Sequence, residues 1–107
     1  MGKSSNRDSY QRKIKTKLWI WDGPSPWYFI TVPKSESMEI KKIFGAYHRG
    51  WGSIPVSVRI GASNWKTSIF WEKKGTYLFP IKKEIRRAEN LTSGDLISLT
   101  LLIENVI

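Results

Sequence analysis

The residues of this sequence best suited to chemistry are cations and tryptophans, and a first group of them lies near the N-terminus. Lys13, Lys15 and Lys17 occupy every second position there. Trp19 and Trp21 continue the same alternation. A period of two is typical of a strand, so the five side chains are expected to share one face, spaced about 6–7 Å apart. That spacing suits the phosphates of an extended single strand, with the tryptophans stacking on bases.

A second group surrounds the segment RGWGSIPV (49–56). Its two glycines permit backbone conformations closed to other residues, which would bring Trp51 close to a neighbouring strand. Arg49 and Arg59 are near enough along the chain to meet one anionic group together. With Lys66, these residues form the candidate ligand site. The alternative is a conformationally demanding loop that only closes the fold.

The residues that most catalytic and metal sites need are scarce. The sequence has no cysteine and one histidine, His48, which argues against any metal site and excludes a cysteine nucleophile. The nine carboxylates are scattered, and no glycine-rich loop has the spacing of a phosphate-binding or dinucleotide-binding loop. His48 also lies outside any nucleophile motif. We therefore expect a non-catalytic protein with no catalytic residue, no cofactor and no metal.

The net charge of +9 is concentrated at one end of the 107 residues. Residues 1–17 hold six lysines and arginines against one aspartate, or +5. A basic segment can bind phosphates or simply keep a protein soluble, and we favour the second reading for a disordered tail over residues 1–12. No apolar run is long enough to span a bilayer, and no hydrophobic stretch follows the N-terminus. The expected location is the cytoplasm. The sequence does not distinguish a monomer from a homodimer.

The elements that must position these side chains are mostly strands, in a single domain over residues 13–107. Alternation of apolar residues and turn-forming Gly, Pro and Asp predict six strands. They are Lys13–Trp21, Trp27–Val32, Ile54–Ile60, Trp65–Trp71, Thr76–Ile81 and Leu96–Ile103. The last is apolar at nearly every position, which predicts burial on both faces or the lining of a barrel interior. Since large aromatics pack a small barrel well, the six tryptophans are read first as core.

Two short helices complete the predicted order. Ser35 can cap the first, in which one apolar stripe is formed by Ile40, Ile43, Phe44 and Tyr47. The second covers Ile81–Asn90 and is opened by a proline. The fold class is therefore mainly β with two short helices.

Four segments carry a family resemblance. They are PWYFITVP (26–33), RGWGSIPVSVRIG (49–61), NWKTSIF (64–70) and GTYLFPIKKEIRRAENLTSGD (75–95). In order and spacing they resemble the bacterial family called Domain of Unknown Function 1905, over residues 13–103. The resemblance implies a small closed barrel of the double-split type, with about six strands and two short helices, and it implies no activity. The expected function is a small binding or accessory domain with an unidentified ligand, for which an anion is one option. Weak, sequence-independent nucleic-acid binding is the alternative.

Overall fold

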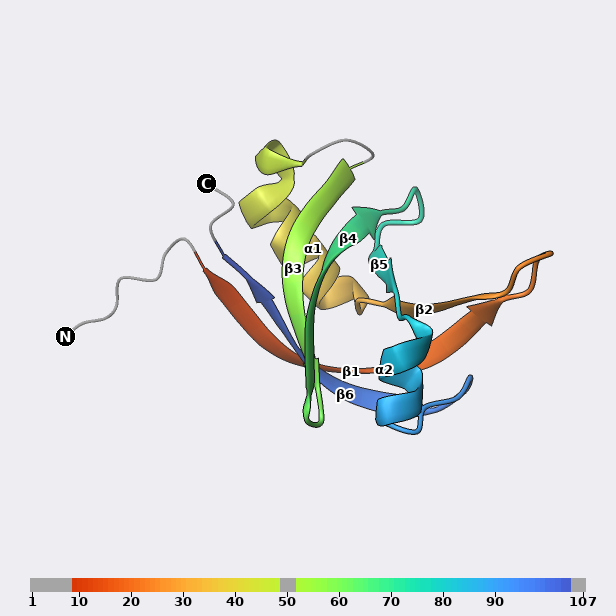
Figure 1. Cartoon of the computed structure of the whole chain (residues 1–107). Coiled ribbons are helices and arrows are strands. Elements are labelled where there is room, and N and C mark those ends of the chain that lie inside the picture. The colour runs from red at the N-terminus through yellow and green to blue at the C-terminus, as the bar shows by residue number, and fades with distance from the viewer. Residues whose placement is uncertain (1–8, 49–51, 105–107) are drawn as a thin grey trace.

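Six antiparallel strands close into a barrel within residues 9–48 and 52–104, the part of the chain that the computed structural model describes. Around the barrel their order is β1-β2-β5-β4-β3-β6 (Figure 1). The strands are β1 (Tyr10–Trp21), β2 (Trp27–Thr31), β3 (Ser53–Ile60), β4 (Ser63–Trp71), β5 (Tyr77–Pro80) and β6 (Leu96–Ile103). Two helices, α1 (Lys34–Phe44) and α2 (Lys83–Ala88), and a 3-10 turn, η1 (Gly45–Tyr47), accompany them. For these residues the predicted closed barrel with two short helices is confirmed.

The long strand β1 changes partner along its length. Residues 10–17 pair with β6, and residues 18–21 pair with β2. Figure 1 shows the second part running on as one arm of a projecting hairpin. At the change of partner, the Leu18 N–H donates to the Asp95 carbonyl at 3.0 Å, while its carbonyl accepts from the Gly94 N–H at 2.8 Å. Since β6 also pairs with β3, one continuous sheet surface runs from β1 across β6 to β3.

The strand β1 begins at Tyr10, three residues before the start predicted from the alternation. Tyr10 is buried, and its ring packs edge-on against Phe44 of α1 at 6.1 Å between centroids. Its hydroxyl also donates to a carboxylate oxygen of Glu39. Residues 10–12 are thus part of the barrel, and residues 1–8 of the predicted tail lie outside the described residues.

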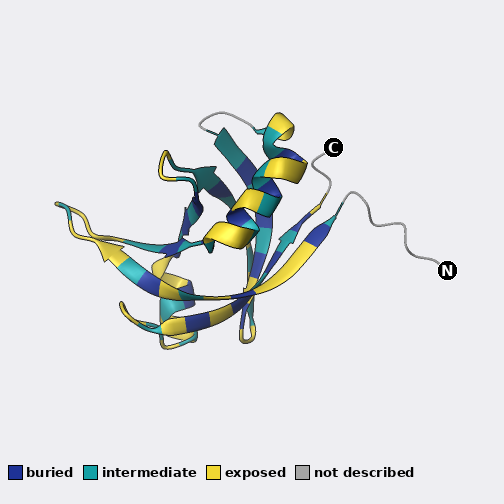
Figure 2. Ribbon diagram, turned by 180° about the vertical axis from the view of Figure 1, so that it is seen from behind, coloured by how far each residue is buried: buried dark blue, intermediate teal, exposed yellow. Residues whose placement is uncertain are grey.

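Alternate residues of the strands fill the barrel, and Figure 2 shows buried and exposed positions alternating along them. In β6, the last strand in the sequence, the buried positions are Ile97, Leu99, Leu101 and Ile103. Leu96 is 62% exposed, so the prediction of burial on both faces is wrong and the lining of a barrel interior is correct. The other face of β6 carries Ser98 and Thr100 between Leu96 and Leu102, so two hydroxyls lie at the middle of the strand on the outside of the barrel.

Helix α1 packs on the barrel through a narrower stripe than the sequence predicts. Ile40 and Phe44 are fully buried, but Ile43 and Tyr47 are exposed. Ile43 lies within the helix on its outward side, whereas Tyr47 leaves the stripe because a 3-10 turn with a different period follows Phe44. The predicted Ser35 cap is also wrong, since no side chain caps this helix and the Ser35 hydroxyl bonds only to its neighbour, Glu36.

Ser37, one turn into α1, is the serine that ties the helix to the barrel. It is fully buried. Its hydroxyl donates to the Val32 carbonyl at 2.9 Å and accepts from the Tyr77 N–H at 3.0 Å. The two bonds join the helix to the segment after β2 and to the start of β5.

No helix in the described part of the chain has the length and apolar character needed to cross a bilayer.

Candidate functional site

One row of polar side chains crosses four strands on the outside of the barrel. Lys13 of β1 lies opposite Thr100 of β6, and Thr100 lies opposite Arg59 of β3. Arg59 in turn lies opposite Asn64 of β4. Directly paired residues project from the same face of a sheet, so all four side chains point outward together. Because neighbouring strands are about 4.8 Å apart, Lys13 and Arg59 project about 10 Å apart with Thr100 between them.

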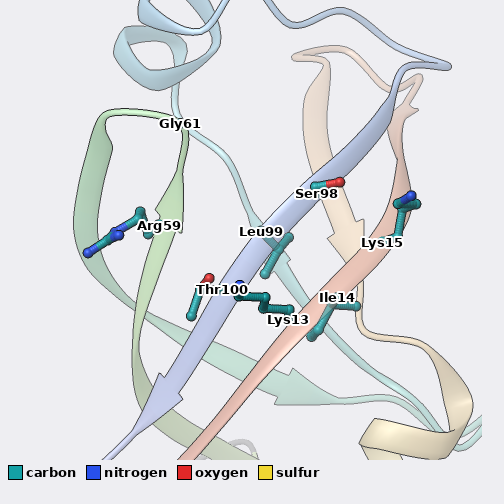
Figure 3. Close-up of a pocket in the computed structure, with 8 residues that line it drawn as sticks. All are labelled: Lys13, Ile14, Lys15, Arg59, Gly61, Ser98, Leu99 and Thr100. Atoms are coloured by element: carbon teal, nitrogen blue, oxygen red, sulfur yellow. The ribbon is translucent and has the colours of Figure 1, made fainter.

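A surface pocket of about 340 Å³ lies over this row. It is lined by Lys13, Ile14, Lys15, Arg59, Gly61, Ser98, Leu99 and Thr100. Figure 3 shows the two lysines on β1 and Arg59 on β3, on either side of β6 with its two hydroxyl groups. None of these eight described lining residues is acidic. We call the five polar residues of this pocket, Lys13, Lys15, Arg59, Ser98 and Thr100, the basic groove.

Arg59 is turned toward β4 in this arrangement. Its Nε donates to Asn64 Oδ1 at 3.3 Å, and Figure 3 shows the guanidinium directed away from Lys13. The side chains of Arg59, Lys13 and Lys15 are all exposed, so each has room for other rotamers. The groove therefore offers three flexible cationic side chains whose backbone positions are set by paired strands.

The predicted ligand site is only partly present in the described residues. Arg49 and Trp51 lie outside them. Arg59 lines the basic groove, whereas Lys66 lies on β4 opposite Ser57, one row further along the sheet. Lys66 lines a neighbouring pocket of about 220 Å³ together with Glu104. Arg59 and Lys66 thus share a face of the barrel without sharing one pocket.

The lysines and tryptophans of β1 differ in their exposure to solvent. Lys13, Lys15 and Lys17 are exposed. Trp19 is partly buried, and its indole N–H donates to Thr31 Oγ1 at 2.8 Å. Its ring lies 5.1 Å from that of Phe29 between centroids, so Trp19 packs onto the barrel wall. Trp21 is 49% exposed at the end of the hairpin.

The hydroxyls of Ser98 and Thr100 in the basic groove were missed by reasoning from the sequence. A signal for them exists, because these two polar residues stand two positions apart in the apolar run LISLTLLI, where the inward residues are Ile and Leu. Polar residues at a period of two mark the outer face of a half-buried strand. No local signal in the sequence predicts which strands flank Ser98 and Thr100.

The one histidine, His48, makes a contact within the fold. His48 Nε2 lies 2.6 Å from the hydroxyl of the fully buried Tyr77. Burial raises the pKa of Tyr77 to about 12, while burial and the charge of Lys41 lower the pKa of His48. Both groups are therefore neutral at pH 7, and their hydrogen bond ties the end of η1 to β5. Among the described residues, no three histidine or acidic side chains gather where they could hold a metal ion.

Comparison with known proteins gives a family for this fold. A model of the family described as Domain of unknown function (DUF1905) matches residues 15–101. The match runs from β1 to β6 and includes every residue of the basic groove except Lys13. No curated protein matches the chain. Since the family model covers most of the sequence, the chain belongs to the family described as Domain of unknown function (DUF1905).

Proposed function

We propose that this domain is a small binding module that takes a phosphate-bearing anion in the basic groove. The proposal rests on one observation. Residues from both groups singled out in the sequence line the same pocket: Lys13 and Lys15 of β1, and Arg59 of β3. The hydroxyls between them add neutral donors, and none of the described lining residues is acidic, while the Glu89 carboxylate lies beside Gly61 at the edge of the groove.

The spacing of the cations favours a ligand with several phosphates. Lys13 and Lys15 are two residues apart on one strand, or about 6–7 Å, and Arg59 projects about 10 Å from Lys13. The backbone positions are far enough apart for each cation to contact a different phosphate, so a chain of phosphates can use all three cations at once. Because the cations are exposed, each contact is weak and sensitive to salt.

The proposed role is non-catalytic, and the expected cytoplasmic location is retained as part of the proposal. The groove is lined by ammonium, guanidinium and hydroxyl groups, with no described carboxylate or imidazole to accept a proton from a substrate. Sequence-independent binding of nucleic acid is the second candidate, and the exposed Lys17 and Lys66, which extend the positive surface beyond the groove, favour it.

The test is a titration of the full chain with a fluorescently labelled abasic oligonucleotide, which supplies phosphates without bases. Arg59→Gln or Lys13→Gln should weaken binding about two- to fivefold each, the usual worth of an exposed charge contact. Lys83→Gln, at an exposed lysine of α2 outside the groove, is the matched control and should change nothing. Equal affinities for all four proteins, or no binding at low salt, would refute the proposal.

A further inference from the structure

We propose that the ligand is a single-stranded nucleic acid and that one of its bases stacks in a second pocket, which Trp27 and Trp65 line. This inference rests on the proposed binding of phosphates in the basic groove and adds the class of polymer. The second pocket has a volume of about 260 Å³. It is lined by Trp27, Trp65, Lys66, Thr67, Pro80, Ile81 and Lys82, and we call it the aromatic pocket.

The aromatic pocket is a consequence of how the strands diverge. β4 pairs with β5 only at its last two residues, Phe70 and Trp71. The rest of β4 pairs with β3 alone, which leaves a notch between β4 and the corner where β5 leads to α2. That corner is fixed, because the Ile81 N–H donates to the Tyr28 carbonyl of β2 at 2.9 Å and the Ile81 side chain is buried. The walls of the notch are therefore built from paired strands, which suits a preformed site.

The two tryptophans give this pocket the chemistry of a base-stacking site. Trp27 is 52% exposed, and one face of its ring stacks on Phe29 at 6.1 Å between centroids and 14° between planes. A base can cover the opposite face. Trp65 is partly buried and packs against the hydrophobic core, which holds it in place. Stacking on such rings accepts every base, because each base has a π-face.

The aromatic pocket is linked to the basic groove by two further pockets, and each neighbouring pair shares lining residues. Lys66 and Thr67 line both the aromatic pocket and the 220 Å³ pocket beside it. Ser57 and Leu102 line both that pocket and a fourth pocket of about 200 Å³. This fourth pocket shares Lys13, Arg59 and Thr100 with the basic groove. A chain of hollows thus crosses the outside of the barrel from Trp27 to Lys15.

The charges along these hollows match a polyphosphate backbone. The cations, in order, are Lys82, Lys66, Arg59, Lys13 and Lys15. One carboxylate, Glu104, is found among the described residues that line the four pockets. A single small anion would use one of these hollows only. A single strand supplies both a phosphate for each cation and a base for the aromatic pocket at one end.

The test compares an oligothymidylate with the abasic oligonucleotide of the same length and label, by fluorescence anisotropy at low salt. The wild-type chain should bind the oligothymidylate about tenfold more tightly, the effect of one stacked base. Trp27→Ala should remove this preference and leave the affinity for the abasic strand unchanged. Arg59→Gln should weaken binding of both strands equally and keep the preference.

Trp21→Ala is the matched control, since Trp21 is an equally exposed tryptophan that pairs with Trp27 across the hairpin but does not line the aromatic pocket. It should keep the preference. Loss of the preference in both tryptophan variants would assign stacking to the hairpin and overturn the inference. Equal binding of the two strands by the wild type, or tighter binding of a duplex than of the single strand, would also overturn it while leaving phosphate binding intact. Failure of both strands to bind would overturn the proposed function as well.

Discussion

The buried hydroxyl of Ser37 gives the sharpest prediction about stability. Ser37→Ala removes the partner of the Tyr77 N–H and the donor to the Val32 carbonyl, at sites where Ser37, Tyr77 and Val32 are all fully buried. A buried polar group left unpaired costs about 1–3 kcal/mol, and a carbonyl tolerates this better than an N–H. The variant should therefore lose about 2–4 kcal/mol of the free energy of unfolding. For a domain of this size that is a fall in Tm of about 10–20 °C.

Urea unfolding followed by far-ultraviolet circular dichroism measures this loss. The matched control is Ser35→Ala, two residues earlier in α1, where the hydroxyl is exposed and bonds only to Glu36. It should stay within about 0.5 kcal/mol of the wild type, as exposed substitutions usually do. If Ser37→Ala were no more destabilised than Ser35→Ala, the reasoning that the Ser37 hydroxyl holds α1 to the barrel would be refuted.

Three further predictions concern charge. The hydrogen bond from Tyr10 lowers the pKa of Glu39 below its usual 4.5, so the stability that ionised Glu39 contributes is lost as the pH falls through that lowered pKa. In Glu39→Gln, the midpoint of urea unfolding should therefore depend less on pH below 4.5 than in the wild type. Burial and then the charge of Lys41 lower the pKa of His48 below its usual 6.5, so below pH 6.5 the unfolded state binds the proton more readily and stability declines. In His48→Asn, the midpoint of urea unfolding should decline less steeply below pH 6.5. Parallel pH profiles of the midpoint for variant and wild type would contradict this. For the abasic oligonucleotide, the three cations of the basic groove at ~0.7 each should contribute about −2 to the slope of log affinity against log salt. Lys15→Gln should make the slope shallower by about 0.7 units, and an unchanged slope would exclude Lys15 from the contacts.

The strands themselves could be predicted because their signals are local. Alternation and turn residues predict β6 with the bounds that the structure has, Leu96–Ile103. The pairing of β6 with both β1 and β3 has no local signal, since it joins segments far apart in the sequence. For that reason the sequence placed Lys13 and Arg59 in two different candidate sites, although Thr100 alone separates them in the sheet.

Side-chain roles were less predictable than strand positions. The alternation correctly places Trp19 on the same face as Lys17, but it cannot reveal that the indole N–H bonds to Thr31 across the hairpin. In α1, a serine near the start of a helix is a common capping signal, and it predicted Ser35 as the cap. The role of Ser37 has no such local signal, because it depends on a hydrogen bond with Tyr77 of β5, much later in the chain.

The position of β6 between β1 and β3 also determines when this fold can form. Of the six strands in the described residues, β6 is the last to leave the ribosome, and until it does, the facing edges of β1 and β3 have no partner. The barrel can then close only after synthesis of nearly the whole domain, because its register joins Tyr10 to Ile103. Such non-local pairing is slow, and open strand edges invite pairing with other chains in the meantime. Chaperone demand during synthesis should consequently be set by the last strand, however stable the finished barrel is.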